Sequence, residues 1–136
     1  MPDADFRKIL RALAEGDVRF IVVGGGASVL DGAPASTFDL DIVPARDPKN
    51  VKALLRVLDS LGTTYRTPPG TRFKPGSSHL SSPGRHNLVT NLGPLDVSGS
   101  IGSGLTYHDL LPRTIEAEIG EGVQVRVLKK KQRGPA

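Results

Sequence analysis

The stretch Val22 to Pro44, VVGGGASVLDGAPASTFDLDIVP, places a run of glycines after one apolar strand and two aspartates within the next. An aspartate is rarely buried unless it pairs with a positive group or a cation. Because side chains alternate along a strand, Asp39 and Asp41 are expected on one face and the apolar residues around them on the other. This pattern predicts that the two carboxylates face a ligand.

A third aspartate occurs in similar surroundings further along the chain. Asp96 lies in PLDV, an apolar segment that predicts a strand and gives no other reason to hold a charge. Close carboxylates repel each other unless a cation lies between them, and Mg²⁺ combines carboxylate ligands with substrate phosphates. We therefore expect Asp39, Asp41 and Asp96 to hold Mg²⁺ or Mn²⁺. For any one of these aspartates alone, the alternative to metal binding is a residue at a strand end that accepts hydrogen bonds from a turn.

The glycines at 24–26 need a separate explanation, because a strand that runs into glycines is typical of several phosphate-binding folds. The segment lacks the third glycine of a dinucleotide-binding fingerprint, and no GxxxxGK[ST] motif occurs in the chain. A glycine turn followed by a short helix can still hold an anion on free backbone N–H groups. A tight turn without a ligand is the alternative interpretation.

The remaining pattern predicts an α/β (α+β) fold, with a small mixed β-sheet and helices packed mainly on one side. We expect a single domain over residues 1–128 and a basic C-terminal tail over 129–136. Residues 77–85 are expected to form a flexible loop. The expected helical segments are 6–16, 27–32, 47–62 and a turn at 107–112, and the expected strands are 19–23, 37–43, 63–66, 72–74, 87–91, 94–99 and a hairpin over 114–128.

Composition narrows the chemistry. The chain has 136 residues and no cysteine, which excludes disulfides, thiolate metal sites and thiol nucleophiles. No stretch approaches the ~20 apolar residues of a membrane span, so we expect a cytoplasmic protein that does not act at a membrane. The three histidines show no metal-ligand spacing, which disfavours a histidine-based hydrolase.

The net charge of +4 is unevenly distributed along the chain. No acidic residue occurs between Ser60 and Leu95, and four of the last eight residues are basic. Such regions attract phosphates, although a solvated loop explains the charges equally well. The candidate phosphate or RNA contacts are Arg66, Arg72, Lys74 and Arg85.

The segment GGGASVLDGAPASTFDLDIV, with GG-x-A followed by T-x-D-x-D, resembles the signature of minimal nucleotidyltransferases of the DNA polymerase β-like superfamily. PLDV resembles the strand that carries their third carboxylate, and the resemblance covers residues 18–128. Members often have an arginine two residues before the threonine, where this chain has Ala35. A basic group for the triphosphate must then come from elsewhere.

The resemblance implies a nucleotidyltransferase that moves a nucleoside monophosphate from an NTP to an acceptor hydroxyl. It assigns metal binding and catalysis to the three aspartates, with Asp96 the candidate for deprotonating the acceptor. The acceptor would be an RNA end such as tRNA, a protein or a small molecule, and a toxin paired with an antitoxin is consistent with the family. The alternative is a non-catalytic nucleotide- or RNA-binding module. The implied nucleotide-binding residues are Gly24, Gly25, Ala27, Ser28 and Thr37.

Overall fold

The computed structural model describes residues 5–24, 40–68 and 70–129. Seven strands of the described chain form one sheet in the order β3-β4-β5-β2-β1-β7-β6. The pairs β1·β7 and β2·β5 are parallel and the other neighbours are antiparallel, so the sheet is mixed as predicted. The strands are β1 (Phe20–Val23), β2 (Leu40–Pro44), β3 (Thr64–Tyr65), β4 (Arg85–Thr90), β5 (Gly93–Ser98), β6 (Thr114–Gly120) and β7 (Val123–Leu128).

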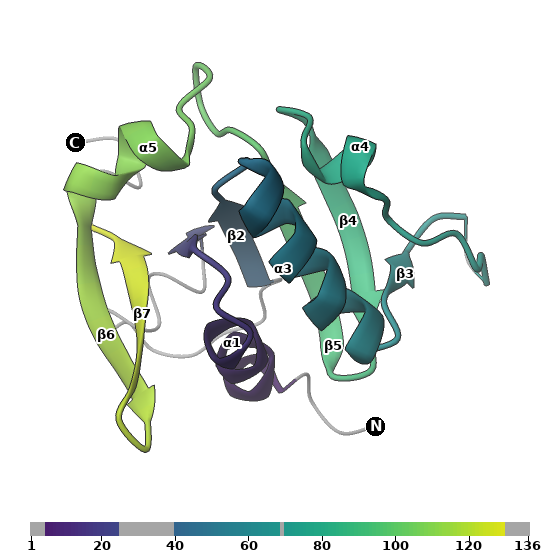
Figure 1. The fold of residues 1–136 in the computed structure, drawn as a ribbon, viewed down its shortest axis with the longest axis horizontal. Coiled ribbons are helices and arrows are strands. Elements are labelled where there is room, and N and C mark those ends of the chain that lie inside the picture. Colours follow the sequence, from purple (N-terminus) through teal and green to yellow (C-terminus); the bar gives the residue numbers. More distant parts are fainter. Residues whose placement is uncertain (1–4, 25–39, 69, 130–136) are drawn as a thin grey trace.

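The two longest described helices cover one face of the sheet. Helices α1 (Phe6–Glu15) and α3 (Pro48–Ser60) lie in front of the strands in Figure 1. Their apolar residues pack against side chains from the central strands to form the main core. This arrangement confirms the predicted fold class, a mixed sheet with helices mainly on one side.

Local sequence explains where these helices begin and end. Asp47 caps α3 by accepting a hydrogen bond from the Asn50 N–H, and Pro48 occupies the first helical position, as predicted. Helix α1 begins after Asp5, whose side chain accepts from the Lys8 N–H, and its C-cap is Gly16. These caps satisfy backbone groups that have no partner within a helix.

The other face of the sheet is covered over its β1 and β7 side. Short helix α5 (Tyr107–Leu110) and the 3₁₀ turn η1 (Leu111–Arg113) follow β5, close to the predicted helical turn. Tyr107 and Leu110 pack with Ile21, Val23 and Leu128 in a second, smaller apolar cluster. Strands β4 and β5 lie on the far side of β2 from this cluster.

Several local expectations were wrong. Residues 77–85 do not form a continuous loop, because α4 (Ser77–Leu80) lies within them and β4 already begins at Arg85. Serine hydroxyls stabilise this segment by local bonds to backbone carbonyls, for example from Ser81 to Ser77. Residues 72–74 form no strand, although the Phe73 carbonyl accepts from the Tyr65 N–H. The helix expected over 27–32 lies outside the described residues.

Within the ranges described above, no helix combines the length and the apolar composition that crossing a membrane requires.

Candidate functional site

Strand register brings Asp41 and Asp96 side by side. The two residues are directly paired in the parallel ladder of β2 and β5. Their sequence neighbours Leu40 and Leu95 point into the helix-covered core, so alternation turns both carboxylates to the opposite face. On either side the register continues to Val23 in β1 and Asn87 in β4.

Asp96 is fully buried and accepts hydrogen bonds on both carboxylate oxygens. Arg66 donates from Nη2 to Oδ1 at 2.5 Å, and Arg85 donates from Nη2 to Oδ2 at 2.7 Å. Arg66 follows β3 and is held by a second bond, from Nη1 to the Leu88 carbonyl at 3.0 Å. A buried carboxylate needs such partners, because an uncompensated charge in the interior costs several kcal/mol.

Asp41 is partly exposed and shares one of these arginines. Its Oδ2 lies 3.4 Å from Nη1 of Arg85, and its Oδ1 accepts a longer bond of 3.5 Å from the Ser98 hydroxyl. Arg85 therefore contacts the Oδ2 atoms of both aspartates with its two terminal nitrogens. Its Nε donates to the side chain of Asn87, an exposed bond that helps to orient the guanidinium toward the two acids.

The first residue of the glycine turn lies beside Asp41. Gly24 follows β1 and has a φ of +69°, a backbone conformation that residues with a Cβ rarely adopt. A Cβ placed there would lie 3.8 Å from the Asp41 Cβ and 3.9 Å from its Oδ2. The end of β1 and the acidic pair therefore form one site, at the edge where β1 ends and β2 begins.

The donor chemistry of this site fits a divalent cation. Asp41 and Asp96 offer hard carboxylate oxygens from adjacent strands, and both already converge on one positive group, Arg85. Among residues 5–24, 40–68 and 70–129, no three His, Cys, Asp or Glu side chains come together as a metal site. Asp39 lies outside the described residues, and so do the predicted nucleotide-binding residues Gly25, Ala27, Ser28 and Thr37.

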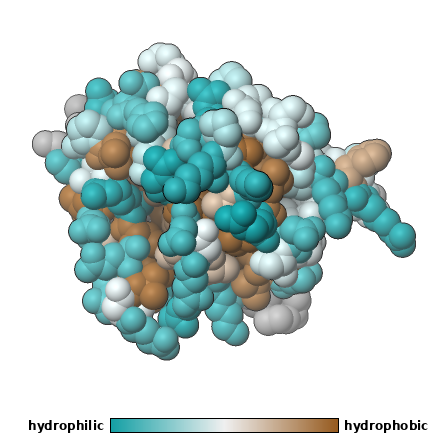
Figure 2. Space-filling model, viewed as in Figure 1, coloured by the Kyte–Doolittle hydropathy of each residue, from teal (hydrophilic) through white to brown (hydrophobic). Residues whose placement is uncertain are grey.

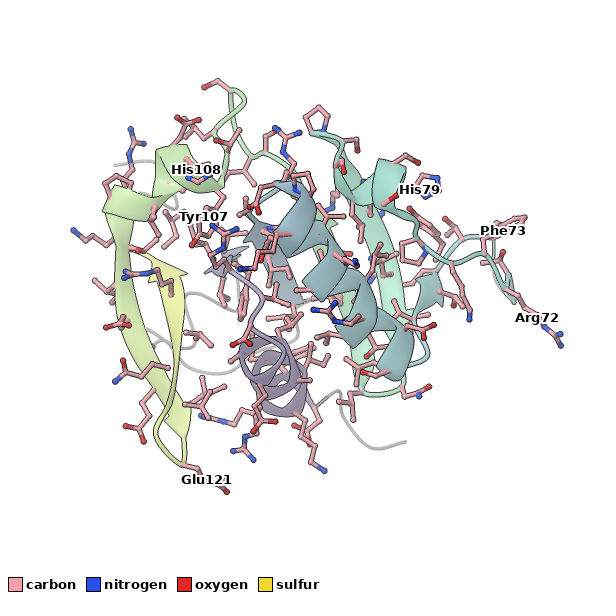
Figure 3. All side chains as sticks on the ribbon, viewed as in Figure 1. Arg72, Phe73, His79, Tyr107, His108 and Glu121 are labelled. Carbon is pink, nitrogen blue, oxygen red and sulfur yellow. The ribbon has the colours of Figure 1, made fainter. Side chains whose placement is uncertain are left out.

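The four basic residues singled out from the sequence separate into two pairs. Arg66 and Arg85 donate to the acidic pair, whereas Arg72 and Lys74 flank Phe73 on a loop beyond β3. Phe73 is 69% exposed, and Figure 3 shows Arg72 and Phe73 projecting from the sheet edge. In Figure 2 the loop forms the protrusion at the right, where a hydrophobic residue adjoins hydrophilic ones. The sequence analysis did not single out Phe73.

The histidines at 79 and 86 form a separate cluster with Tyr65. His86 pairs with Val97 in the ladder, which places it on the core face and away from the acids. The Tyr65 hydroxyl lies 3.1 Å from its Nδ1, and the Ser82 hydroxyl lies 3.2 Å from its Nε2. Burial lowers the pKa of His86 and raises the pKa of Tyr65.

Sequence reasoning missed Asn87 and Ser98, which contact the site through Arg85 and Asp41. A signal exists for Ser98, because DVS in β5 alternates polar and apolar side chains. RHN in β4 is polar at every position, so alternation does not mark Asn87. The pairing between these strands, which sequence alone does not give, is what brings the two polar sets together.

Comparison with known proteins supports the fold. No family model and no curated protein matches the sequence. Among solved structures, the chain is similar to the crystal structure of a protein from Thermotoga maritima that is described as a "putative nucleotidyltransferase". The TM-score is 0.60 at 17% sequence identity, and the match covers 94% of this chain and 77% of that one. This likeness shows a nucleotidyltransferase-like fold, and function must be argued from the site.

Proposed function

We propose that this protein is a nucleotidyltransferase that moves a nucleoside monophosphate from an NTP to an acceptor hydroxyl. The observation that carries the proposal is the convergence of Asp41 and Asp96, on adjacent parallel strands, beside Gly24. Nucleotidyl transfer depends mainly on positioning and charge stabilisation, which a carboxylate pair at a glycine turn can support. The similar fold of the Thermotoga maritima protein adds support.

The residues of the site divide into two roles in this proposal. Asp41 and Asp96, together with Asp39, would hold Mg²⁺ or Mn²⁺. When bound, the cations would lower the pKa of the acceptor hydroxyl and stabilise the pyrophosphate leaving group. The turn that begins at Gly24 would present backbone N–H groups to the triphosphate, with Gly25, Ala27, Ser28 and Thr37 as further contacts.

The contacts of the two acids suggest which one faces the acceptor. Asp96 has no solvent exposure, and both of its oxygens accept from arginines. Asp41 keeps 16% of its side chain exposed, and its oxygens lie 3.4 Å from Nη1 of Arg85 and 3.5 Å from the Ser98 hydroxyl. We therefore assign the acceptor side to Asp41, instead of Asp96 as the resemblance implied.

The acceptor that the described residues favour is RNA. Phe73 offers an exposed ring between Arg72 and Lys74, and aromatic rings flanked by cations suit unstacked bases and phosphates. The loop that carries them begins at Arg66, one of the two arginines on Asp96. A tRNA end is the acceptor we place first, as expected for a toxin of a toxin–antitoxin pair, and a protein target comes second.

Transfer of label tests this proposal directly. Each of the four α-labelled NTPs would be incubated with the protein, Mg²⁺ or Mn²⁺, and either total RNA or a cell lysate. We expect metal-dependent label on RNA, and a loss of at least about a hundredfold in Asp41→Asn. Glu116→Gln, an exposed acid on β6, is the matched control and should transfer at the wild-type rate.

The results separate the possible acceptors and the possible functions. Label on protein instead of RNA would support nucleotidyl transfer but would show that the acceptor is a protein. Transfer by Asp41→Asn at the wild-type rate would contradict the site.

A second candidate function has one observation in its favour. Because Arg66 and Arg85 already neutralise Asp96, the same fold could bind a nucleotide without catalysing transfer. A non-catalytic module would retain labelled NTP in an equilibrium binding assay and pass no label to RNA or protein. An active enzyme would do both.

A further inference from the structure

Arg85 occupies the position between the two acids that a bridging cation would take. Its Nη1 and Nη2 lie 3.4 Å and 2.7 Å from the Oδ2 atoms of Asp41 and Asp96. A planar guanidinium with several donors suits two carboxylates at once. The positive charge of Arg85 therefore reduces the repulsion between the two acids, in addition to the contact of Arg66 with Asp96.

The two arginines at the site are held differently. Arg66 is bonded to a backbone carbonyl as well as to Asp96, and 26% of its side chain is exposed. Arg85 donates to the side chains of Asn87, Asp41 and Asp96, and 55% of its own side chain is exposed. Arg85 can leave the acids by rotating into solvent, whereas Arg66 would also have to abandon the Leu88 carbonyl.

We propose that Arg85 is an exchangeable cation, which holds Asp41 and Asp96 together until a divalent ion binds and then turns to the substrate phosphates. The inference rests on the proposed function, because it assumes that the acidic pair binds metal. It also supplies the basic group that Ala35 does not provide. Arg85 is then a substrate-positioning residue that the sequence pattern of the family does not identify.

Electrostatics makes the exchange necessary if metal is bound at these atoms. A guanidinium within 3.4 Å of both Oδ2 atoms and a divalent ion on the same oxygens would be like charges a few ångströms apart. Metal binding therefore has to displace Arg85, and this displacement lowers the apparent metal affinity. Once displaced, the guanidinium remains beside the site, where a triphosphate offers it oxygens of the opposite charge.

The direct test is Mn²⁺ binding in the absence of nucleotide, followed by electron paramagnetic resonance of the free ion. We expect Arg85→Gln to bind Mn²⁺ about tenfold more tightly than the wild type, because the competing charge is gone. Arg19→Gln is the matched control. The side chain of Arg19 is similarly exposed, at 49%, and forms an ion pair with Asp47. Arg19 precedes β1 and Asp47 follows β2. Its loss should leave Mn²⁺ affinity unchanged.

Nucleotide binding gives a second readout, with the opposite sign. At saturating Mg²⁺, Arg85→Gln should bind ATP about tenfold more weakly, because a charged phosphate contact is lost. If Arg85 had a purely structural role, its replacement would not raise the affinity for metal and lower the affinity for nucleotide in the same variant. Arg85→Lys should fall between the wild type and Arg85→Gln in both measurements, since a single ammonium group cannot bridge both acids as a guanidinium does.

The outcomes distinguish this inference from the proposed function. Equal Mn²⁺ affinity in the wild type and Arg85→Gln would overturn the inference alone. Absence of Mn²⁺ binding in both would overturn the proposed metal-dependent function as well. If Arg85→Gln fails to fold, NMR on the wild type decides the question, because the Arg85 Nε–H resonance should shift on titration with Mg²⁺. An unchanged Arg85 resonance at saturating Mg²⁺ would contradict the exchange.

Discussion

The two faces of strands β2 and β5 differ in what stabilises them. On the helix-covered face, Leu40, Ile42, Leu95 and Val97 are buried in the main core. On the other face the same strands carry Asp41, Asp96 and Ser98. Alternation along a strand turns neighbouring residues to opposite faces, so one backbone supports an apolar core and a charged site.

The charged face is no less buried at its centre than the apolar face. Asp96 is 0% exposed, and so is its sequence neighbour Leu95. Burial of Leu95 is favourable by itself, because it removes apolar surface from water. Burial of Asp96 is tolerated only because two arginines compensate its charge, and a buried ion pair is weak evidence for stability. We infer that the charged face is retained for function.

The largest expected effect comes from removing the charge of Asp96, at the centre of the charged face. Asp96→Asn would leave Arg66 and Arg85 without their shared charge, and should lower the free energy of unfolding by about 3–5 kcal/mol. Leu95→Ala, one residue away on the other face, should cost about 2–5 kcal/mol through lost burial and a cavity. Urea unfolding of both variants measures these values.

A double variant separates the two mechanisms. Adding Arg66→Met to Asp96→Asn should recover part of the loss, because it removes a positive charge that has lost its partner. Adding Arg66→Met to Leu95→Ala should lower stability further, since Asp96 then loses a partner. Losses that add in both backgrounds would contradict the idea that charge compensation stabilises this face.

Sequence patterns were sufficient for the apolar face and for the acids themselves. Apolar residues at helical spacing gave α1 and α3, and an acid within an apolar strand marked Asp41 and Asp96 as unusual. These features are local, because they depend on alternation, helical periodicity and capping. The mixed sheet with helices mainly on one side followed from the order of the elements.

What could not be predicted depends on pairing between distant segments. Arg85 lies in the segment expected to be a flexible loop and Arg66 lies at the end of an expected strand. Only the ladder from β3 through β4 to β5 brings both arginines to Asp96. Short helix α4 was missed because serine side chains stabilise it locally, without an apolar period. Long-range contacts of this kind leave almost no signal in a single sequence.

A smaller effect is expected where the glycine turn begins. Gly24→Ala should lower the free energy of unfolding by about 1–2 kcal/mol, because φ of +69° strains a side chain. Gly122→Ala is the matched control, with φ of +77° in the β6–β7 turn and open space around a Cβ. Both variants should lose similar stability in urea, but only Gly24→Ala should change nucleotide affinity. Equal nucleotide affinity in the two would remove the turn from the site.

The smallest expected effect is a loss of stability at acidic pH, and it depends on His86 on the helix-covered face of the sheet. Burial holds the pKa of His86 below its ordinary value of 6.5, so the folded state favours the neutral ring, whose Nδ1 is hydrogen-bonded with the Tyr65 hydroxyl. Well above pH 6.5 this histidine is neutral in both states, so its contribution to stability is constant. Below it the unfolded chain binds the proton first, so stability should fall as pH drops toward 5, before carboxylates titrate. Denaturant midpoints measured across this range should lose this slope in His86→Gln and keep it in His108→Gln, a change at an exposed histidine of α5. A slope that survives in His86→Gln would assign the acid sensitivity to another group.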